Sequence, residues 1–165
     1  MKILIGTDGS EFSHAAIERA CELMENATET EIKLVSVYTL PTITTEPFIA
    51  SPDLSQKVSE DAKDLAEDHI EKARNIILDR LPNSAVTAEV AMGSPGQMIV
   101  ETADDWEPDL IVVGSHGRGF WARSLLGSVS DAVVHHAPCS VLVVRSSGAR
   151  GGRRISLESE EPEPI

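Results

Sequence analysis

Short aliphatic runs alternate along the chain with longer stretches whose apolar residues recur every three or four positions. The first run, at residues 2–6, stops at Gly-Thr-Asp-Gly-Ser, and helical spacing then continues as far as Met24. The run EIKLVSVY at 31–38 is aliphatic on both faces, which is typical of a strand buried in a parallel sheet. The predicted strands are 2–6, 31–38, 86–92, 109–113 and 140–145, and the predicted helices run from about 11 to 24, from 52 to just before Pro82, from 95 to 103 and from 128 to 136.

This alternation of strands and helices predicts an α/β fold, an open doubly wound parallel sheet with helices on both faces. If the chain winds one way through the first three strands and then crosses back, strands one and four become neighbours at the centre. Residues 39–51 hold prolines and threonines without a period and are predicted to form a long loop. Residues 1–146 are predicted to form a single domain, and 147–165 are predicted to be a disordered acidic tail because their composition cannot supply a core.

The charge balance narrows the classes of partner. The chain has 165 residues with 27 acidic against 14 basic side chains, and its net charge of −13 argues against binding nucleic acid or an anionic membrane face. A phosphate ligand is compatible with this charge, because a few main-chain N–H groups at a helix start can hold it locally. No apolar run approaches the roughly 20 residues of a membrane helix, and the opening residues lack a signal-peptide pattern, so we expect a cytoplasmic protein.

The residues best suited to chemistry lie in the loops after the first and fourth predicted strands. In doubly wound sheets, ligands bind at the carboxyl ends of the strands, where the winding reverses. Glycines let main-chain N–H groups approach an anion closely, and the start of a helix adds donors without intrahelical partners. We therefore predict a phosphate cradle in the second loop, at Gly114, Gly117, Gly127 and Ser128, whose spacing is Gly-x2-Gly-x9-Gly-Ser. Thr7 and Asp8 of the first loop are predicted to face the same crevice.

Several polar residues near this cradle have structural alternatives. Asp8 suits a turn or capping role as well as a ligand contact. Ser128 and Ser130 could offer hydroxyl donors to phosphate, while Ser128 equally suits the N-cap of the following helix. Arg118 could pair with a phosphate or offset the acidic surface. His116 could contact phosphate, but no acid adjacent in sequence orients it as a base, so no catalytic residue is assigned.

Two stretches carry a resemblance to a known family. The opening KILIGTDGSEFSHAAIERA and the run VVGSHGRGFWARSLLGSVSDAVVHHAPCSVLVVR resemble the universal stress protein family, specifically its ATP-binding branch, from residue 1 to about residue 145. The resemblance implies a five-stranded parallel sheet in the order 3-2-1-4-5, in agreement with the crevice expected between strands one and four. It implies ATP or AMP as ligand, and we expect Mg²⁺ or Mn²⁺ to accompany it through phosphate oxygens and water.

The resemblance also implies roles for particular residues. Asp8 matches the acidic residue that contacts the ribose, with Thr7 beside it, and Val37 matches the position whose backbone hydrogen-bonds adenine. Gly6 stands where the family has a proline or an aliphatic residue. The phosphate and ribose loop is matched by Gly114, Gly117, Gly127, Ser128, Val129 and Ser130.

The last predicted strand lies at an edge of the sheet in this order. Its apolar part, from Val141 to Val144, contains no proline or inward charge, and an unprotected edge of this kind invites pairing. Family members dimerise through this strand. The resemblance therefore implies a homodimer in which strand five runs antiparallel to its symmetry mate.

The motifs together predict a stress-response protein that binds ATP or AMP at the carboxyl end of the sheet and acts as a nucleotide-dependent switch. Hydrolysis is expected to be slow or absent, because the chain has no P-loop lysine and no paired carboxylates beside the glycine loop. One alternative is a dimeric interaction module of the same fold that binds no nucleotide. Another, an adenylating enzyme with a Ser-Gly-Gly-x-Asp-Ser loop, is disfavoured because the loop here reads Thr-Asp-Gly-Ser.

Overall fold

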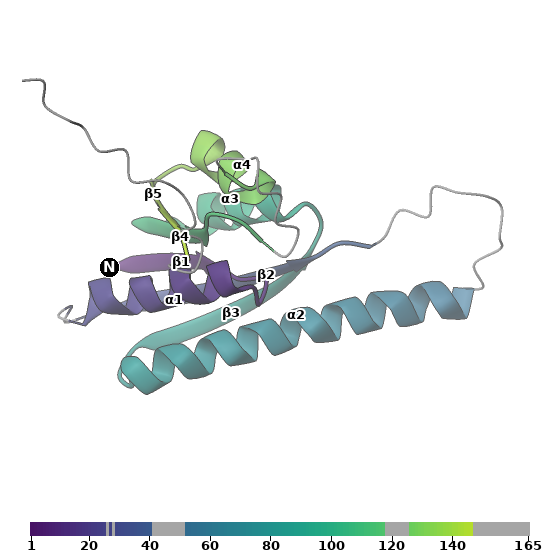
Figure 1. Cartoon of the computed structure of the whole chain (residues 1–165), viewed down its shortest axis with the longest axis horizontal. Helices are drawn as coiled ribbons and strands as arrows, with labels where there is room; N and C mark the ends of the chain where they lie inside the picture. Colours follow the sequence, from purple (N-terminus) through teal and green to yellow (C-terminus); the bar gives the residue numbers. More distant parts are fainter. Residues whose placement is uncertain (26, 28, 41–51, 118–125, 147–165) are drawn as a thin grey trace, which may run out of the picture.

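The computed structural model describes residues 1–25, 27, 29–40, 52–117 and 126–146. Within these ranges the strands form one parallel sheet of five, in the order β3-β2-β1-β4-β5, which confirms the predicted fold (Figure 1). Arg118, residues 41–51 of the predicted loop and the predicted tail at 147–165 lie outside the described residues. The elements are β1 (Lys2–Gly6), α1 (Glu11–Met24), β2 (Glu31–Tyr38), α2 (Pro52–Arg80), β3 (Ala85–Met92), α3 (Pro95–Trp106), β4 (Leu110–Gly114), α4 (Ser128–His136) and β5 (Ser140–Val144).

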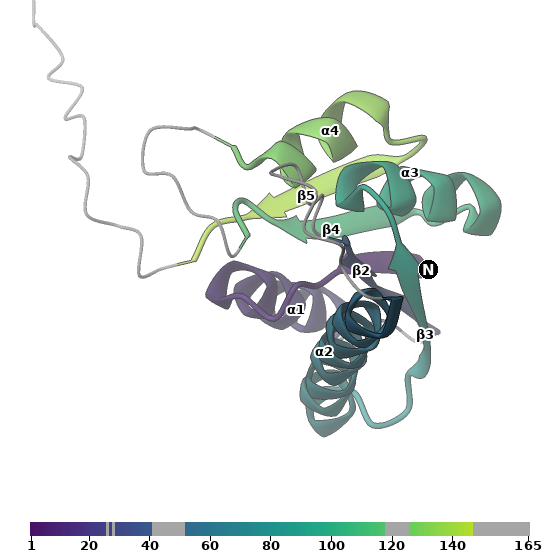
Figure 2. The same cartoon turned by 90° about the vertical axis from the view of Figure 1, so that its right-hand side faces the viewer.

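The two faces of the sheet bury separate hydrophobic clusters. Helices α1 and α2 cover one face and α3 and α4 cover the other (Figure 2). Side chains alternate along each strand, so on β2 Leu34 packs toward α1 and α2 whereas Val35 and Val37 pack with the α3 side. The aliphatic content of β1, β2 and β4, noted in the sequence, is therefore explained by burial on both faces.

Not every leucine at helical spacing is buried in the helices. Leu23 on α1 and Leu65 on α2 follow the helical period, yet they are 48% and 42% exposed. The buried stripe of α2 consists of Ala66, Ile70 and Ala73, followed by Ile77 one turn later. No helix among the described residues is long and apolar enough to cross a membrane.

The ends of the elements set the geometry of the carboxyl edge of the sheet. β1 stops at Gly6, opposite Val35 of β2, and the last bond between the two strands is donated by the Thr7 N–H to the Val35 carbonyl at 2.9 Å. β2 continues to Tyr38 beside β3. The central strand is thus shorter than its neighbour, which leaves a gap between β2 and β4 at this edge.

Candidate functional site

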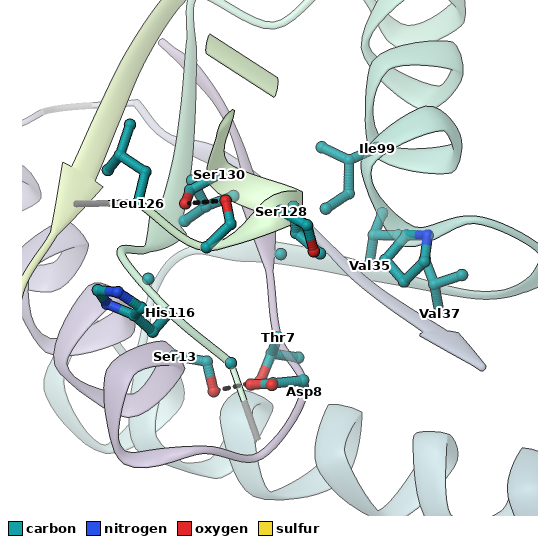
Figure 3. A pocket seen from close by; sticks show the side chains of 17 residues that line it. Thr7, Asp8, Ser13, Val35, Val37, Ile99, His116, Leu126, Ser128 and Ser130 are labelled. Carbon is teal, nitrogen blue, oxygen red and sulfur yellow. Dashed lines mark hydrogen bonds between the residues drawn. The ribbon is translucent and has the colours of Figure 1, made fainter. Parts of the chain in front are cut away.

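A cavity of about 350 Å³ occupies this gap at the carboxyl ends of β1, β2 and β4 (Figure 3). It lies at the switch point predicted from the strand order, because β1 is flanked by β2 on one side and β4 on the other. Nine of the predicted site residues line it, namely Thr7, Asp8, Val37, Gly114, Gly117, Gly127, Ser128, Val129 and Ser130.

The turn after β1 holds the Asp8 carboxylate in a fixed orientation. Its Oδ1 accepts hydrogen bonds from the Ser10 amide at 3.1 Å and from the Ser10 hydroxyl at 2.6 Å. Ser10 is itself the N-cap of α1, where its Oγ accepts from the Ser13 amide at 3.2 Å. Gly9 adopts a positive φ of +71° in this turn. Asp8 is therefore a turn-forming residue and also a lining residue of the cavity.

The loops after β1 and β4 meet where Gly117 lies against Asp8. A Cβ atom at position 117 would stand 2.7 Å from Asp8 Oδ2, so the close approach requires glycine unless the carboxylate moves. At position 114 a Cβ would stand 2.7 Å from the carbonyl carbon of Phe12 in α1, which cannot move away as easily as a side chain. The first two glycines of the motif thus allow two segments far apart in sequence to touch.

The start of α4 corrects one of the structural alternatives. The N-cap of α4 is Gly127, not Ser128. Ser128 is the first residue of the helix, and it is exposed. The amides of Ser128, Val129 and Ser130 belong to the first helical turn and have no carbonyl partner within the helix. They give this end of the cavity three donors and the positive end of the helix dipole.

Two hydrogen bonds fasten this helix start to the loop after β4. The buried Ser130 hydroxyl donates to the Ser115 carbonyl at 3.0 Å, and the Gly127 amide donates to the same carbonyl at 2.8 Å. Ser115 is anchored to β5, because its amide donates to the Val144 carbonyl at 2.7 Å. The Ser130 hydroxyl and the Gly127 amide thus stabilise the loop through the Ser115 carbonyl. The amides after Gly127 belong to the first turn of α4.

The opposite end of the cavity is apolar and borders a bare main-chain edge. On β2, Val35 turns its carbonyl toward β1, so Val37, two residues on, turns its N–H and C=O to the same side. β1 has ended there, and none of the described strands pairs with β2 at that position. Val37 thus offers one donor and one acceptor beside an apolar wall of Val35 and Ile99 (Figure 3).

Sequence reasoning missed the part of this wall contributed by α3. Ile99 recurs at helical spacing and reads as an ordinary core residue, but its Cδ1 lies 2.9 Å from the position that a Cβ on Gly6 would take. Gly6, the departure from the family pattern, lets Ile99 approach the end of β1. Other lining residues not assigned from the sequence are Ser13, Pro95, Val113 and Leu126.

His116 lines the cavity as well, although it was assigned no role. Its Nδ1 lies 3.1 Å from the Ser115 hydroxyl, and its ring centroid is 5.3 Å from that of Phe12. Packing against α1 therefore holds the imidazole in position. Among the described residues, no group of three or more His, Cys, Asp or Glu side chains could hold a metal ion.

Fold and site together define a class of protein, a doubly wound α/β protein with a ligand-sized crevice at its switch point. The model of the universal stress protein family matches residues 1–145, and the chain belongs to this family. Universal stress protein MJ0531 of Methanocaldococcus jannaschii is 32% identical to the chain over 146 residues, which cover 87% of this chain and 81% of that protein.

Solved structures of the family agree with this assignment. Universal stress protein UspA from Lactobacillus plantarum superposes with a TM-score of 0.73 at 26% identity, over 88% of this chain and 97% of that one. A universal stress protein in complex with cAMP superposes with a TM-score of 0.59 at 26% identity, over 89% of this chain and 98% of that one. The resemblance to the universal stress protein family is confirmed, and the ATP-binding branch stays a prediction.

The contacts of the two close-packed glycines predict different consequences of adding one methyl group. Gly114→Ala forces a Cβ against the backbone of Phe12 and should lower the free energy of unfolding by about 1–3 kcal/mol, the usual range for overpacking. Among the described residues, a Cβ in Gly117→Ala meets the end of the Asp8 side chain, which can move, so this variant should lower the free energy of unfolding by less than about 1 kcal/mol. Urea denaturation of both variants measures the difference, and equal losses of stability would contradict the described contacts.

Proposed function

We propose that the cavity binds an adenine nucleotide, ATP or AMP, which would place the chain in the ATP-binding branch of its family. The proposal rests on three features that meet in one cavity. They are an apolar wall beside the main-chain groups of Val37, the carboxylate of Asp8, and the start of α4, which lies next to closely packed glycines. A nucleotide has the matching parts, which are an aromatic base, a ribose diol and phosphates.

The base is assigned to the end of the cavity formed by β2 and α3. Adenine presents an acceptor at N1 next to a donor at its exocyclic amino group, and the N–H and C=O of Val37 offer the complementary pair. Val35 and Ile99 supply apolar surface for the faces of the ring. Guanine reverses both groups on this edge, so the arrangement favours adenine.

The ribose and phosphates are assigned to the opposite end. The Asp8 carboxylate accepts hydrogen bonds and suits the ribose hydroxyls, with Thr7 next to it at the end of β1. Main-chain groups of Gly114, Gly117 and the first turn of α4 form the phosphate site, and helix starts favour anions. We propose further phosphate contacts from the Ser128 hydroxyl, the side or main chain of Arg118 and the amides of Val129 and Ser130.

A divalent cation fits this site only as a companion of the phosphates. Among the described lining residues, Asp8 carries the one carboxylate, and the other oxygen-bearing side chains are the hydroxyls of Thr7, Ser13, Ser128 and Ser130. Such a set does not hold Mg²⁺ or Mn²⁺ by itself, because these ions are normally bound through one or two carboxylates, substrate phosphates and water. The cation is therefore proposed to depend on a bound polyphosphate.

The proposed activity is that of a nucleotide-dependent switch with slow or no hydrolysis. Asp8 and His116 are the titratable side chains among the described lining residues. One oxygen of Asp8 is engaged by Ser10, and the Nδ1 of His116 lies next to the Ser115 hydroxyl. This arrangement supports positioning of the ligand better than activation of a water molecule.

The relatives support a nucleotide more than an empty interaction module. A family member 26% identical to this chain is known in complex with cAMP, an adenine nucleotide with a single phosphate. The alternative, a dimeric module of the same fold that binds no nucleotide, would require no cavity of this composition.

We propose a cytoplasmic location for the protein, consistent with the absence of a candidate membrane helix among the described residues.

We also propose that the protein is a homodimer formed through β5. This strand ends the sheet and pairs with β4 alone among the described strands. Its residues from Val141 to Val144 are each partly exposed. An antiparallel copy of the same strand would satisfy the outer main-chain groups and cover these aliphatic side chains.

The nucleotide proposal predicts a defined loss of affinity in Gly117→Val. The larger side chain would collide with Asp8 and occupy the space where the two loops meet, so affinity for a fluorescent ATP analogue should fall roughly tenfold or more, or about 1.4 kcal/mol. Gly151→Val, the same change beyond the family match at 1–145, is the control and should bind like the wild type. Equal affinities of wild type and Gly117→Val would speak against the proposed site.

The dimer proposal predicts that Val143→Lys weakens association. Two lysines facing each other across a two-fold interface repel and lose apolar contact, so the dissociation constant should rise roughly tenfold or more. Leu23→Lys adds the same charge at a position that is 48% exposed on α1 and should leave the dimer intact. Sedimentation equilibrium measures both, with circular dichroism to verify folding. A wild-type monomer at micromolar concentration would refute the proposal.

A further inference from the structure

The other edge strand of the sheet is β3, which is longer than β5 and lies outside the proposed nucleotide site and dimer interface. β3 ends the sheet opposite β5, and its eight residues, AVTAEVAM, contain no proline and no lysine. Proline, lysine and bulges are the usual devices that prevent edge strands from pairing. The one charged side chain in the strand, Glu89, lies 3.7 Å from Lys33 of the neighbouring strand β2.

The hydrogen bonds show which main-chain groups of β3 face outward. The Gly93 amide donates to the Tyr38 carbonyl, and Tyr38 is in register with Met92, so Gly93 and Ala91 turn their main-chain groups toward β2. The intervening positions turn theirs away from the sheet. They are Val86, Ala88, Val90 and Met92.

Arg74 of α2 divides this outer edge in two. Its Nη2 donates to the Val86 carbonyl at 2.7 Å, so the first outward acceptor is already satisfied. Within the described residues, no strand pairing and no side-chain hydrogen bond involves the outward main-chain groups of Ala88, Val90 and Met92. Met92 is also 56% exposed, which leaves a flexible apolar side chain at the end of this stretch.

We propose that the outer edge of β3 from Ala88 to Met92 docks an extended, basic segment of a partner protein, which adds a strand to the sheet. A row of alternating N–H and C=O groups at strand spacing is complementary to another extended main chain, which is the basis of strand addition. The Arg74 bond to Val86 marks where the added strand has to end. This surface lies outside the residues that line the nucleotide cavity.

Charge favours a basic partner over a second copy of this chain. Glu71 and Glu67 lie one and two turns before Arg74 on the same side of α2, and both are exposed. Glu67 is paired with Lys63 at 3.3 Å, and the chain as a whole carries −13. Two copies joined through β3 would bring Glu71 and the Glu67–Lys63 pair of each chain toward those of the other, in chains that each carry −13, whereas a strand with lysine or arginine at alternate positions would meet the opposite charge of the two glutamates.

Hydrogen exchange read by NMR tests the geometry and the partner in one series. In the free protein the amides of Ala88 and Val90 should exchange much faster than those of Glu89 and Ala91, which face β2. A blocked peptide of alternating lysine and valine should slow exchange at Val90 by roughly tenfold at saturation, since protection reports pairing. The matched peptide with glutamate in place of lysine should give no protection.

Two variants separate the edge from the rest of the fold. Val90→Pro removes an outward N–H and no bond to β2, so the protein should fold and lose the response to the lysine peptide. The double variant E67K/E71K keeps the edge and should weaken peptide binding roughly tenfold if charge selects the partner.

Three outcomes would overturn the proposal. The first is equally slow exchange at Val90 and Ala91 in the free protein, and the second is the absence of protection by the lysine peptide. The third is protection that grows with protein concentration without peptide, which would identify a second copy as the occupant.

Discussion

The site depends on the early end of β1. The Thr7 amide makes the last bond to β2, at Val35, and the sheet then divides because β2 continues while the central strand turns into the loop that carries Asp8. A longer β1 would pair with Val37 and fill the gap. Ending the strand here leaves unpaired main-chain groups and apolar side chains around one cavity, which is where doubly wound sheets bind their ligands.

Two glycines of the loop after β4 allow this loop to pack closely against the turn after β1 and against α1, which sets the boundaries of the cavity. Gly117 brings the loop after β4 against the Asp8 carboxylate, and Gly114 lets the same loop leave the strand next to α1. Among the described residues, the donors at the far end are backbone amides at the start of α4. The net charge of −13 is therefore compatible with the proposed phosphate site, because the amides and the helix dipole act over a short range.

The sequence allowed the fold and much of the site to be predicted because both depend on local patterns. Aliphatic runs and helical spacing mark the elements, and the motif from Gly114 to Ser128 marks the loop that lines the cavity. The contribution of Ile99 could not be predicted, since its helical spacing is that of any core residue and its place beside Gly6 depends on how α3 crosses the sheet. The capping residue of α4 was also open, because glycine and serine both occur at N-caps and only the backbone conformation distinguishes them.

The central proposal is that the main-chain N–H and C=O of Val37 recognise adenine. Isothermal titration calorimetry with ATP and GTP, under identical magnesium and salt concentrations, tests it most directly. The two nucleotides carry the same ribose and phosphates, so any difference in affinity arises from the base. If Val37 recognises adenine, ATP binds at least roughly tenfold more tightly than GTP, equivalent to about 1.4 kcal/mol. Equal affinity for GTP, or no heat of binding with either nucleotide, would contradict it.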